Sequence, residues 1–108
     1  MANAEYLQVT TTVGSEEEAE QIGAALIERR LAACVQIIGP IASRYRWQGA
    51  IERSTEWMCV AKTSTLRYAE LEAAIRELHS YEEPEVVATP VVAGSAGYLA
   101  WIDENLKP

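Results

Sequence analysis

The sequence has little of several residue types on which common protein classes depend. Its 108 residues include two cysteines, one histidine and no phenylalanine. Small secreted scaffolds are held by several disulfides, so two cysteines favour folding in a reducing cytoplasm. A closed zinc site takes about four ligands, and the sequence contains no C-x-x-C, H-x-x-x-H or H-E-x-x-H. A structural metal centre built from one chain is therefore not expected.

Long apolar runs and familiar catalytic motifs are missing as well. No run approaches the roughly 18 apolar residues that span a membrane, and the N-terminus lacks the basic start and apolar stretch of a secretory signal. There is no P-loop, no G-x-G-x-x-G and no G-x-S-x-G. One histidine without an evident nucleophile makes a catalytic triad a weak hypothesis. We expect a cytoplasmic protein that is not an enzyme and has no organic cofactor.

Basic residues are also scarce. The chain has nine Lys and Arg against sixteen Asp and Glu, for a formal net charge of −7, and the basic residues are scattered. This argues against nucleic acids and membranes as partners. About half of the residues (49%) are apolar, as in ordinary globular proteins. Without a repeat, linker or low-complexity stretch, the sequence predicts one domain over residues 1–108.

The first half of the chain predicts a strand, a helix and a long hairpin. Glu5 to Val13 is rich in β-branched residues and predicts a strand. Ser15 and Glu18 form an S-x-x-E capping box at the start of a helix. The apolar face of this helix predicts burial of Ala19, Ile22, Leu26, Ile27 and Leu31.

An overlong hairpin is expected from about Ala33 to Lys62. The second strand of the chain forms the first arm of the hairpin, from Ala33 to Gln48, with a break at Gly39-Pro40. Gly49 supplies the turn, and the third strand forms the other arm, from Glu56 to Lys62. Two arms of about fourteen residues would reach about 45 Å, whereas a domain of this length is only about 35 Å across. The hairpin must bend or project. Tyr45 and Trp47 share one of its faces, which favours covering by a neighbouring subunit over folding back onto its own domain.

The second half predicts a helix, a strand and a final helix. Tyr68, Leu71, Ile75 and Leu78 form one helical stripe that ends near His79. Glu85 to Val92 predicts a fourth strand, which Pro90 confines to a sheet edge or a bulge. Gly94 to Gly97 then leads into a short helix with apolar residues through Ile102. The order βαββαβ plus a C-terminal helix predicts an α+β, ferredoxin-like sandwich.

The most chemically loaded segment is His79 to Glu85. His79 is either a metal ligand or proton carrier, or a helix-end side chain that interacts with the last carbonyls. With a nearby carboxylate such as Glu85 it could bind Cu(II) or Zn(II) weakly. Cys34 and Cys59, on neighbouring hairpin arms, are more typical of core thiols. Glu56 and Lys62 share a strand face and are either solvated strand ends or part of a ligand cleft.

Five segments in this order resemble the CutA family of divalent-cation tolerance proteins. They are R-L-A-A-C-V (Arg30 to Val35), S-R-Y-R-W-Q-G (Ser43 to Gly49), the strand Glu56 to Thr63 closing in K-T, H-S-Y-E-E-P-E (His79 to Glu85) and Y-L-A-W-I (Tyr98 to Ile102). The resemblance implies a PII-like homotrimer with strand pairing between subunits. It also implies tolerance to copper and other divalent cations.

Carried over by position, the resemblance places a set of residues at a cleft between subunits. The set is Trp47, Glu56, Lys62, Tyr81, Pro84 and Trp101, with His79 and Glu85 as candidate metal ligands. Two further functions stay open: a PII-like module that binds a small anionic ligand through Lys62 and the aromatic residues, and a structural scaffold. The family usually has proline after the histidine, where this chain has Ser80.

Overall fold

The computed structural model describes residues 4–108 and has the predicted element order. Four antiparallel strands form one sheet in the order β2-β3-β1-β4. In chain order the elements are β1 (Tyr6–Val13), α1 (Glu16–Glu28), β2 (Cys34–Trp47), β3 (Ala50–Ser64), a short 3-10 helix (Thr65–Arg67), α2 (Tyr68–Leu78), β4 (Val87–Pro90) and α3 (Ala96–Leu106). The α+β, ferredoxin-like fold with its extra C-terminal helix is therefore confirmed. None of the helices in residues 4–108 is long and apolar enough to span a membrane.

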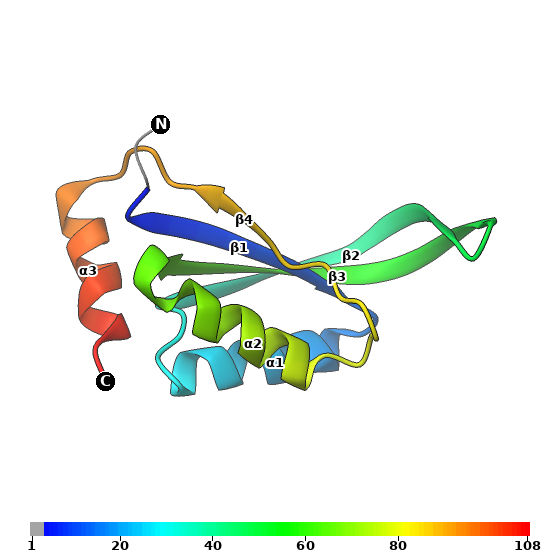
Figure 1. Ribbon diagram of the computed structural model, residues 1–108, viewed down its shortest axis with the longest axis horizontal. Coiled ribbons are helices and arrows are strands. Elements are labelled where there is room, and N and C mark those ends of the chain that lie inside the picture. The colour runs from blue at the N-terminus through cyan, green and yellow to red at the C-terminus, as the bar shows by residue number, and fades with distance from the viewer. Residues whose placement is uncertain (1–3) are drawn as a thin grey trace.

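One face of the sheet carries the core. Helices α1 and α2 lie against this face (Figure 1). Because side chains alternate along a strand, the odd-numbered residues of β1 and β3 point toward the helices. The buried cluster on this side includes Val9, Val13, Ile22, Leu26, Cys59, Ala61, Leu71 and Ile75. The even-numbered residues of these strands face the opposite way, onto a face that α1 and α2 leave open.

Helix α3 packs at the end of the sheet away from the hairpin tip (Figure 1). Ile102 and Leu106 are buried there with Ala33, and Tyr6 and Leu99 pack against them. The hydroxyl of Tyr6 donates a hydrogen bond to Asp103 Oδ2 at 2.6 Å, which ties β1 to α3. Helices α1 and α2 thus form one layer on one face of the sheet, and α3 packs at the end away from the hairpin tip.

Strands β2 and β3 form the predicted long hairpin, which projects beyond the helices as an arm (Figure 1). They pair from Cys34 opposite Lys62 to Trp47 opposite Ala50, and the molecule measures 45 Å along its longest axis. Strand β3 begins at Ala50, earlier than the predicted start at Glu56. Gln48 and Gly49 both have positive φ (50° and 82°), as a tight two-residue hairpin turn requires.

The expected break in β2 is a β-bulge. The register shifts between Ile38 and Ile41, so that Gly39 and Pro40 lie opposite the single residue Trp57. A bulge bends the strand and increases its twist. The Trp57 ring lies directly against Gly39, where an added Cβ would stand 2.4 Å from Trp57 Cδ1. Glycine is required here by close approach.

Two local predictions for α1 need correction. Ser15 Oγ does accept the Glu18 N–H at 3.1 Å, but the Glu18 carboxylate binds Ser80 instead of closing the capping box. Ile27, predicted on the buried face, is 43% exposed, while Leu31 is buried beyond the end of the helix. The prediction for Pro90 is confirmed, because β4 is an edge strand that pairs only with β1.

Candidate functional site

A cavity of about 790 Å³ lies where the arm leaves the core. Its walls come from the end of β1, the outer half of the β2–β3 hairpin and the loop between α2 and β4. The lining residues are Thr12, Ser43, Arg44, Tyr45, Trp47, Glu56, Ser80, Tyr81, Glu82, Glu83 and Glu85. The structure therefore brings four predicted site residues to one cavity: Trp47, Glu56, Tyr81 and Glu85.

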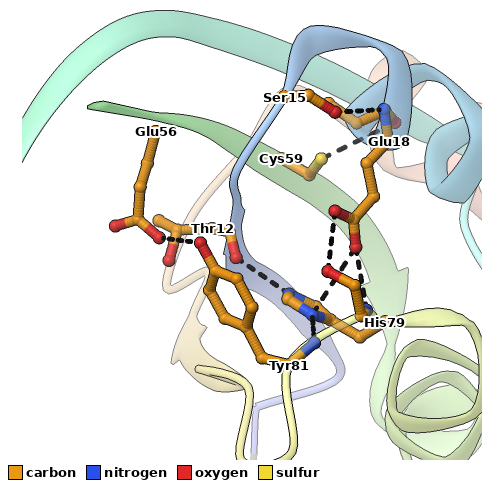
Figure 2. A network of polar contacts seen from close by, with 9 residues as sticks. Thr12, Ser15, Glu18, Glu56, Cys59, His79 and Tyr81 are labelled. Carbon is orange, nitrogen blue, oxygen red and sulfur yellow. Dashed lines mark hydrogen bonds and ion pairs between the residues drawn. The ribbon is translucent and has the colours of Figure 1, made fainter. Parts of the chain in front are cut away.

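Glu56 is the most enclosed charged residue of this cavity. It is only 6% exposed and follows the bulge opposite Ile41, on the open face of the sheet. The hydroxyl of Tyr81 donates a hydrogen bond of 2.8 Å to Glu56 Oε2 (Figure 2). Burial, followed by this bond to Glu56, raises the pKa of the Tyr81 phenol well above its ordinary value. Tyr81 therefore remains a neutral donor throughout the physiological range.

Aromatic rings form the outer wall of the cavity. Tyr45 and Trp47 lie on the same face of β2, with Tyr45 opposite Glu52 and Trp47 opposite Ala50. Their exposures are 43% and 50%, and Tyr81 is 38% exposed. Three partly exposed rings and one nearly buried carboxyl group thus line the same cavity.

The charge of the lining is mainly negative. Four of its side chains are carboxylates, those of Glu56, Glu82, Glu83 and Glu85, whereas Arg44 is its one basic side chain. Glu83 is partly compensated from outside the cavity by Arg76, whose Nη1 lies 3.1 Å from Glu83 Oε2. An electrostatic field of this sign favours cations over anions.

His79 lies behind the cavity wall, with its side chain fully buried. Its Nε2 is 2.8 Å from the Thr12 carbonyl oxygen, and its Nδ1 is 3.0 Å from the Tyr81 backbone nitrogen (Figure 2). The Tyr81 N–H must donate to Nδ1, so Nε2 carries the proton and donates to Thr12. Both ring nitrogens are thereby engaged, and metal binding through His79 would require the loss of one of these bonds.

Glu18 and Ser80 clamp the same loop to the start of α1. The Ser80 N–H donates to Glu18 Oε2 and the Ser80 hydroxyl donates to Glu18 Oε1, each at 2.9 Å. Glu18 Oε2 also lies 3.7 Å from His79 Nδ1. Proline at position 80 could make neither of the two Ser80 bonds, because it lacks both donors. In this chain, a serine thus fixes the loop that carries Tyr81.

Three predicted cleft residues do not line the cavity. Lys62 lies farther along β3, where its Nζ donates to Gln36 Oε1 at 2.6 Å. Trp101 is on α3 and stacks on Tyr98 with ring centroids 5.5 Å apart. Pro84 is buried within the loop. A cleft that joins Lys62 or Trp101 to the arm would have to include a second subunit.

The thiols and carboxylates do not form a ready-made metal centre. Within residues 4–108, no group of three or more His, Cys, Asp or Glu side chains is placed to hold a metal ion. Cys59 is a core thiol as predicted, and burial raises its pKa to about 11. Cys34, in contrast, is only half-buried and lies on the open face of the sheet.

Several cavity residues had no sequence signal that linked them to Glu56. Thr12 and Ser43 are short polar residues in strands. Glu82 and Glu83 belong to the segment His79 to Glu85 that the sequence marks as chemically loaded, but no spacing linked them to Glu56. Alternation along the arm did group Tyr45 with Trp47. That grouping, combined with the nearby acidic segment, was the one signal that could have indicated an aromatic, acidic site.

Comparison with known proteins gives one consistent family. The family model for the CutA1 divalent ion tolerance protein matches residues 7–105. The divalent-cation tolerance protein CutA of Thermus thermophilus is 44% identical over 97 residues, which is 90% of this chain and 94% of that protein. A human protein, described as protein CutA, is 41% identical over 91 residues, covering 84% of this chain and 51% of that protein.

Solved structures agree with these matches. The Thermus thermophilus divalent cation tolerance protein has a TM-score of 0.90 at 43% identity, covering 93% of this chain and 97% of that chain. The Archaeoglobus fulgidus protein, described as a periplasmic divalent cation tolerance protein CutA, has a TM-score of 0.92 at 39% identity, covering 94% and 99%.

Proposed function

This chain belongs to the CutA1 divalent ion tolerance protein family. From that premise we propose that it acts as a homotrimer whose acidic cavity binds divalent cations. The family is one of tolerance proteins and not of enzymes. The observation that carries the proposal is the cavity beside the arm, with four carboxylates and one guanidinium in its lining. Copper is the first metal to test. The cytoplasm remains our prediction for its compartment.

The exposed arm supports assembly. Tyr45, Trp47 and Ile51 are 43%, 50% and 64% exposed on a two-stranded ribbon that no helix covers. Such a ribbon is marginally stable alone in water, and its apolar side chains favour association. In a homotrimer the neighbouring subunits would cover the arm.

Light scattering of the purified protein tests this assembly. We expect wild type to have the mass of three chains, and Trp47→Asp to dissociate because it places a charge on the covered ribbon. Leu66→Asp is the matched control, since Leu66 is 93% exposed and lies away from the arm. A Trp47→Asp protein that keeps the mass of a trimer would contradict this role of the arm.

Calorimetric titration with Cu(II) tests the cation site. Carboxylates bind divalent metals through oxygen, so Glu85→Gln at the cavity should weaken binding, while Glu104→Gln on α3 removes the same charge elsewhere. His79→Ala shows whether the imidazole joins the metal shell. Equal affinity in wild type and Glu85→Gln would remove the cavity from the proposal, and equal affinity in His79→Ala would remove His79.

The same cavity offers no specific support for a small anionic ligand. Lys62, which was to anchor the anion, donates to Gln36 and lies outside the cavity lining. The anion therefore stays a prediction that would need basic groups from a second subunit.

A further inference from the structure

We propose that the interior of the cavity is a binding site for an organic ammonium ion, a molecule with a cationic nitrogen attached to a small apolar body. The inference rests on the proposed function in one respect, because it takes the cavity beside the arm to be the ligand site. It goes further by assigning the chemical class of a ligand other than a metal ion.

The dimensions of the cavity suit a small molecule. Its volume of about 790 Å³ lies within the roughly 300–1,000 Å³ typical of ligand pockets. A bare divalent metal needs several ligand atoms that converge at about 2.0–2.6 Å. The described part of the chain places no three such side chains together. The space is therefore larger, and its acceptors more dispersed, than a single ion requires.

The walls suit a cation that carries hydrocarbon. Tyr45, Trp47 and Tyr81 offer ring surface to the cavity. Aromatic faces attract ammonium groups because the ring quadrupole is negative above and below its plane, and tryptophan is the strongest partner. The same rings also bury the apolar part of a ligand. An anion would gain nothing from these faces.

Glu56 supplies the specific acceptor. Only 6% of its surface is exposed, and it lies in the cavity lining. Tyr81 occupies Oε2, whereas Oε1 receives no hydrogen bond from residues 4–108. Oε1 is therefore an acceptor free to bind a ligand at the cavity surface, and an ammonium N–H would donate a charge-assisted hydrogen bond to it. Glu82 and Glu85 add negative potential at the same cavity.

Arg44 is the one group in the lining that opposes this ligand. It is exposed and lies opposite Arg53 in the hairpin register. Two like charges directly opposite each other repel, and neither makes an ion pair within the described chain. Solvent screens an exposed guanidinium far more than it screens a buried carboxylate. The buried Glu56 therefore dominates the interior of the cavity.

The probe is n-butylammonium chloride, titrated into the wild-type protein at pH 7 and followed by the NMR shift of the Trp47 indole N–H. Sodium butyrate and butan-1-ol have the same chain length with a negative charge and with no charge. We expect saturable binding of n-butylammonium alone. Glu56→Gln should weaken it about tenfold, since a charged hydrogen bond is replaced by a neutral one.

The aromatic contribution has its own matched pair. Trp47→Leu should weaken binding about threefold. Calorimetry measures this binding, because the variant lacks the indole signal. Tyr98→Leu on α3 removes a ring of similar exposure, 41% against 50%, and should leave affinity unchanged. Glu104→Gln controls for net charge in the same way.

The inference is overturned if n-butylammonium shows no saturable binding, if butyrate binds equally well, or if Glu56→Gln and Glu104→Gln have equal effects. The mass of each variant is measured by light scattering. A variant that loses both binding and assembly indicates that the cavity is an interface and not a ligand site. Cu(II) titrations on the same samples test the proposed function separately, because Glu85→Gln can weaken metal binding whether or not the organic cation binds.

Discussion

The Glu18–Ser80 clamp allows a quantitative test of how the cavity loop is held. Ser80→Ala removes the hydroxyl donor at 2.9 Å from Glu18 Oε1 but keeps the backbone N–H that reaches Oε2. Hydrogen bonds to charged groups contribute about 1.5–3 kcal/mol when they are well shielded. Ser80 is exposed, so we expect a lower value, about 1 kcal/mol, for the hydroxyl bond.

Glu18→Ala removes both bonds at once. It also removes a negative charge from the first turn of α1, which interacts with the helix dipole by about 0.3–1 kcal/mol. We therefore expect a loss of about 2–3 kcal/mol in the free energy of unfolding. In the Glu18→Ala background, Ser80→Ala should then have almost no further effect, because its partner is already absent.

Urea unfolding followed by circular dichroism measures this double-mutant cycle, with every protein at one concentration because an oligomer's stability depends on it. The expected coupling energy between Glu18 and Ser80 is about 1 kcal/mol. Ser95→Ala is a suitable control, since its hydroxyl caps α3 and should add independently to Glu18→Ala. If Ser80→Ala destabilises both backgrounds equally, the clamp contributes nothing and the argument fails.

Two further predictions concern the bulge and the β1–α3 contact. Gly39→Ala should destabilise the protein by about 1–3 kcal/mol in urea, because its Cβ meets the Trp57 ring at 2.4 Å. Gly97→Ala should raise the free energy of unfolding by about 0.5 kcal/mol, because alanine favours the α3 helix and an added Cβ meets no atom within 4 Å. Equal effects of Gly39→Ala and Gly97→Ala would contradict the packing argument. The bond to Asp103 raises the pKa of Tyr6 from 10.0 to about 12, so its contribution to stability is present below pH 10 and is lost as pH rises through 12. Between pH 10 and 12 the melting temperature of Tyr6→Phe should therefore fall less than that of wild type. Parallel curves of melting temperature against pH would refute this.

The sequence carried enough local information to predict most of the fold. Alternation and turn residues indicated the long hairpin, and Pro90 correctly indicated an edge strand because it cannot donate to a second neighbour. The start of β3 was placed too late. Residues Ala50 to Thr55 of β3 are partly polar and carry no clear apolar period, yet pairing with β2 extends the strand through them. Tertiary pairing overrode the local pattern.

The site was less predictable because its contacts join distant parts of the chain. Glu56 and Tyr81 are 25 residues apart, and their contact depends on how the loop after α2 returns to the sheet. The capping-box pattern indicated that Glu18 would bond within its own helix, but the loop offered two donors from Ser80. A charged side chain binds the best donors available in the folded chain, and no local spacing rule includes those from a distant loop.

The arm and the cavity share a wall, and this decides which variants can separate assembly from ligand binding. Tyr45 and Trp47 face outward on the ribbon and also line the cavity, so their substitution would affect the proposed neighbouring subunit and the proposed ligand together. Glu56 is different, because only 6% of its surface is exposed. A neighbouring subunit could therefore make little contact with it. Glu56→Gln keeps the size of the side chain and its bond from Tyr81 while it removes the charge. If Glu56→Gln loses the proposed cation binding and keeps the mass of the wild-type assembly, the cavity is a ligand site beside an interface; if its mass falls as well, the charge of Glu56 belongs to the assembly itself.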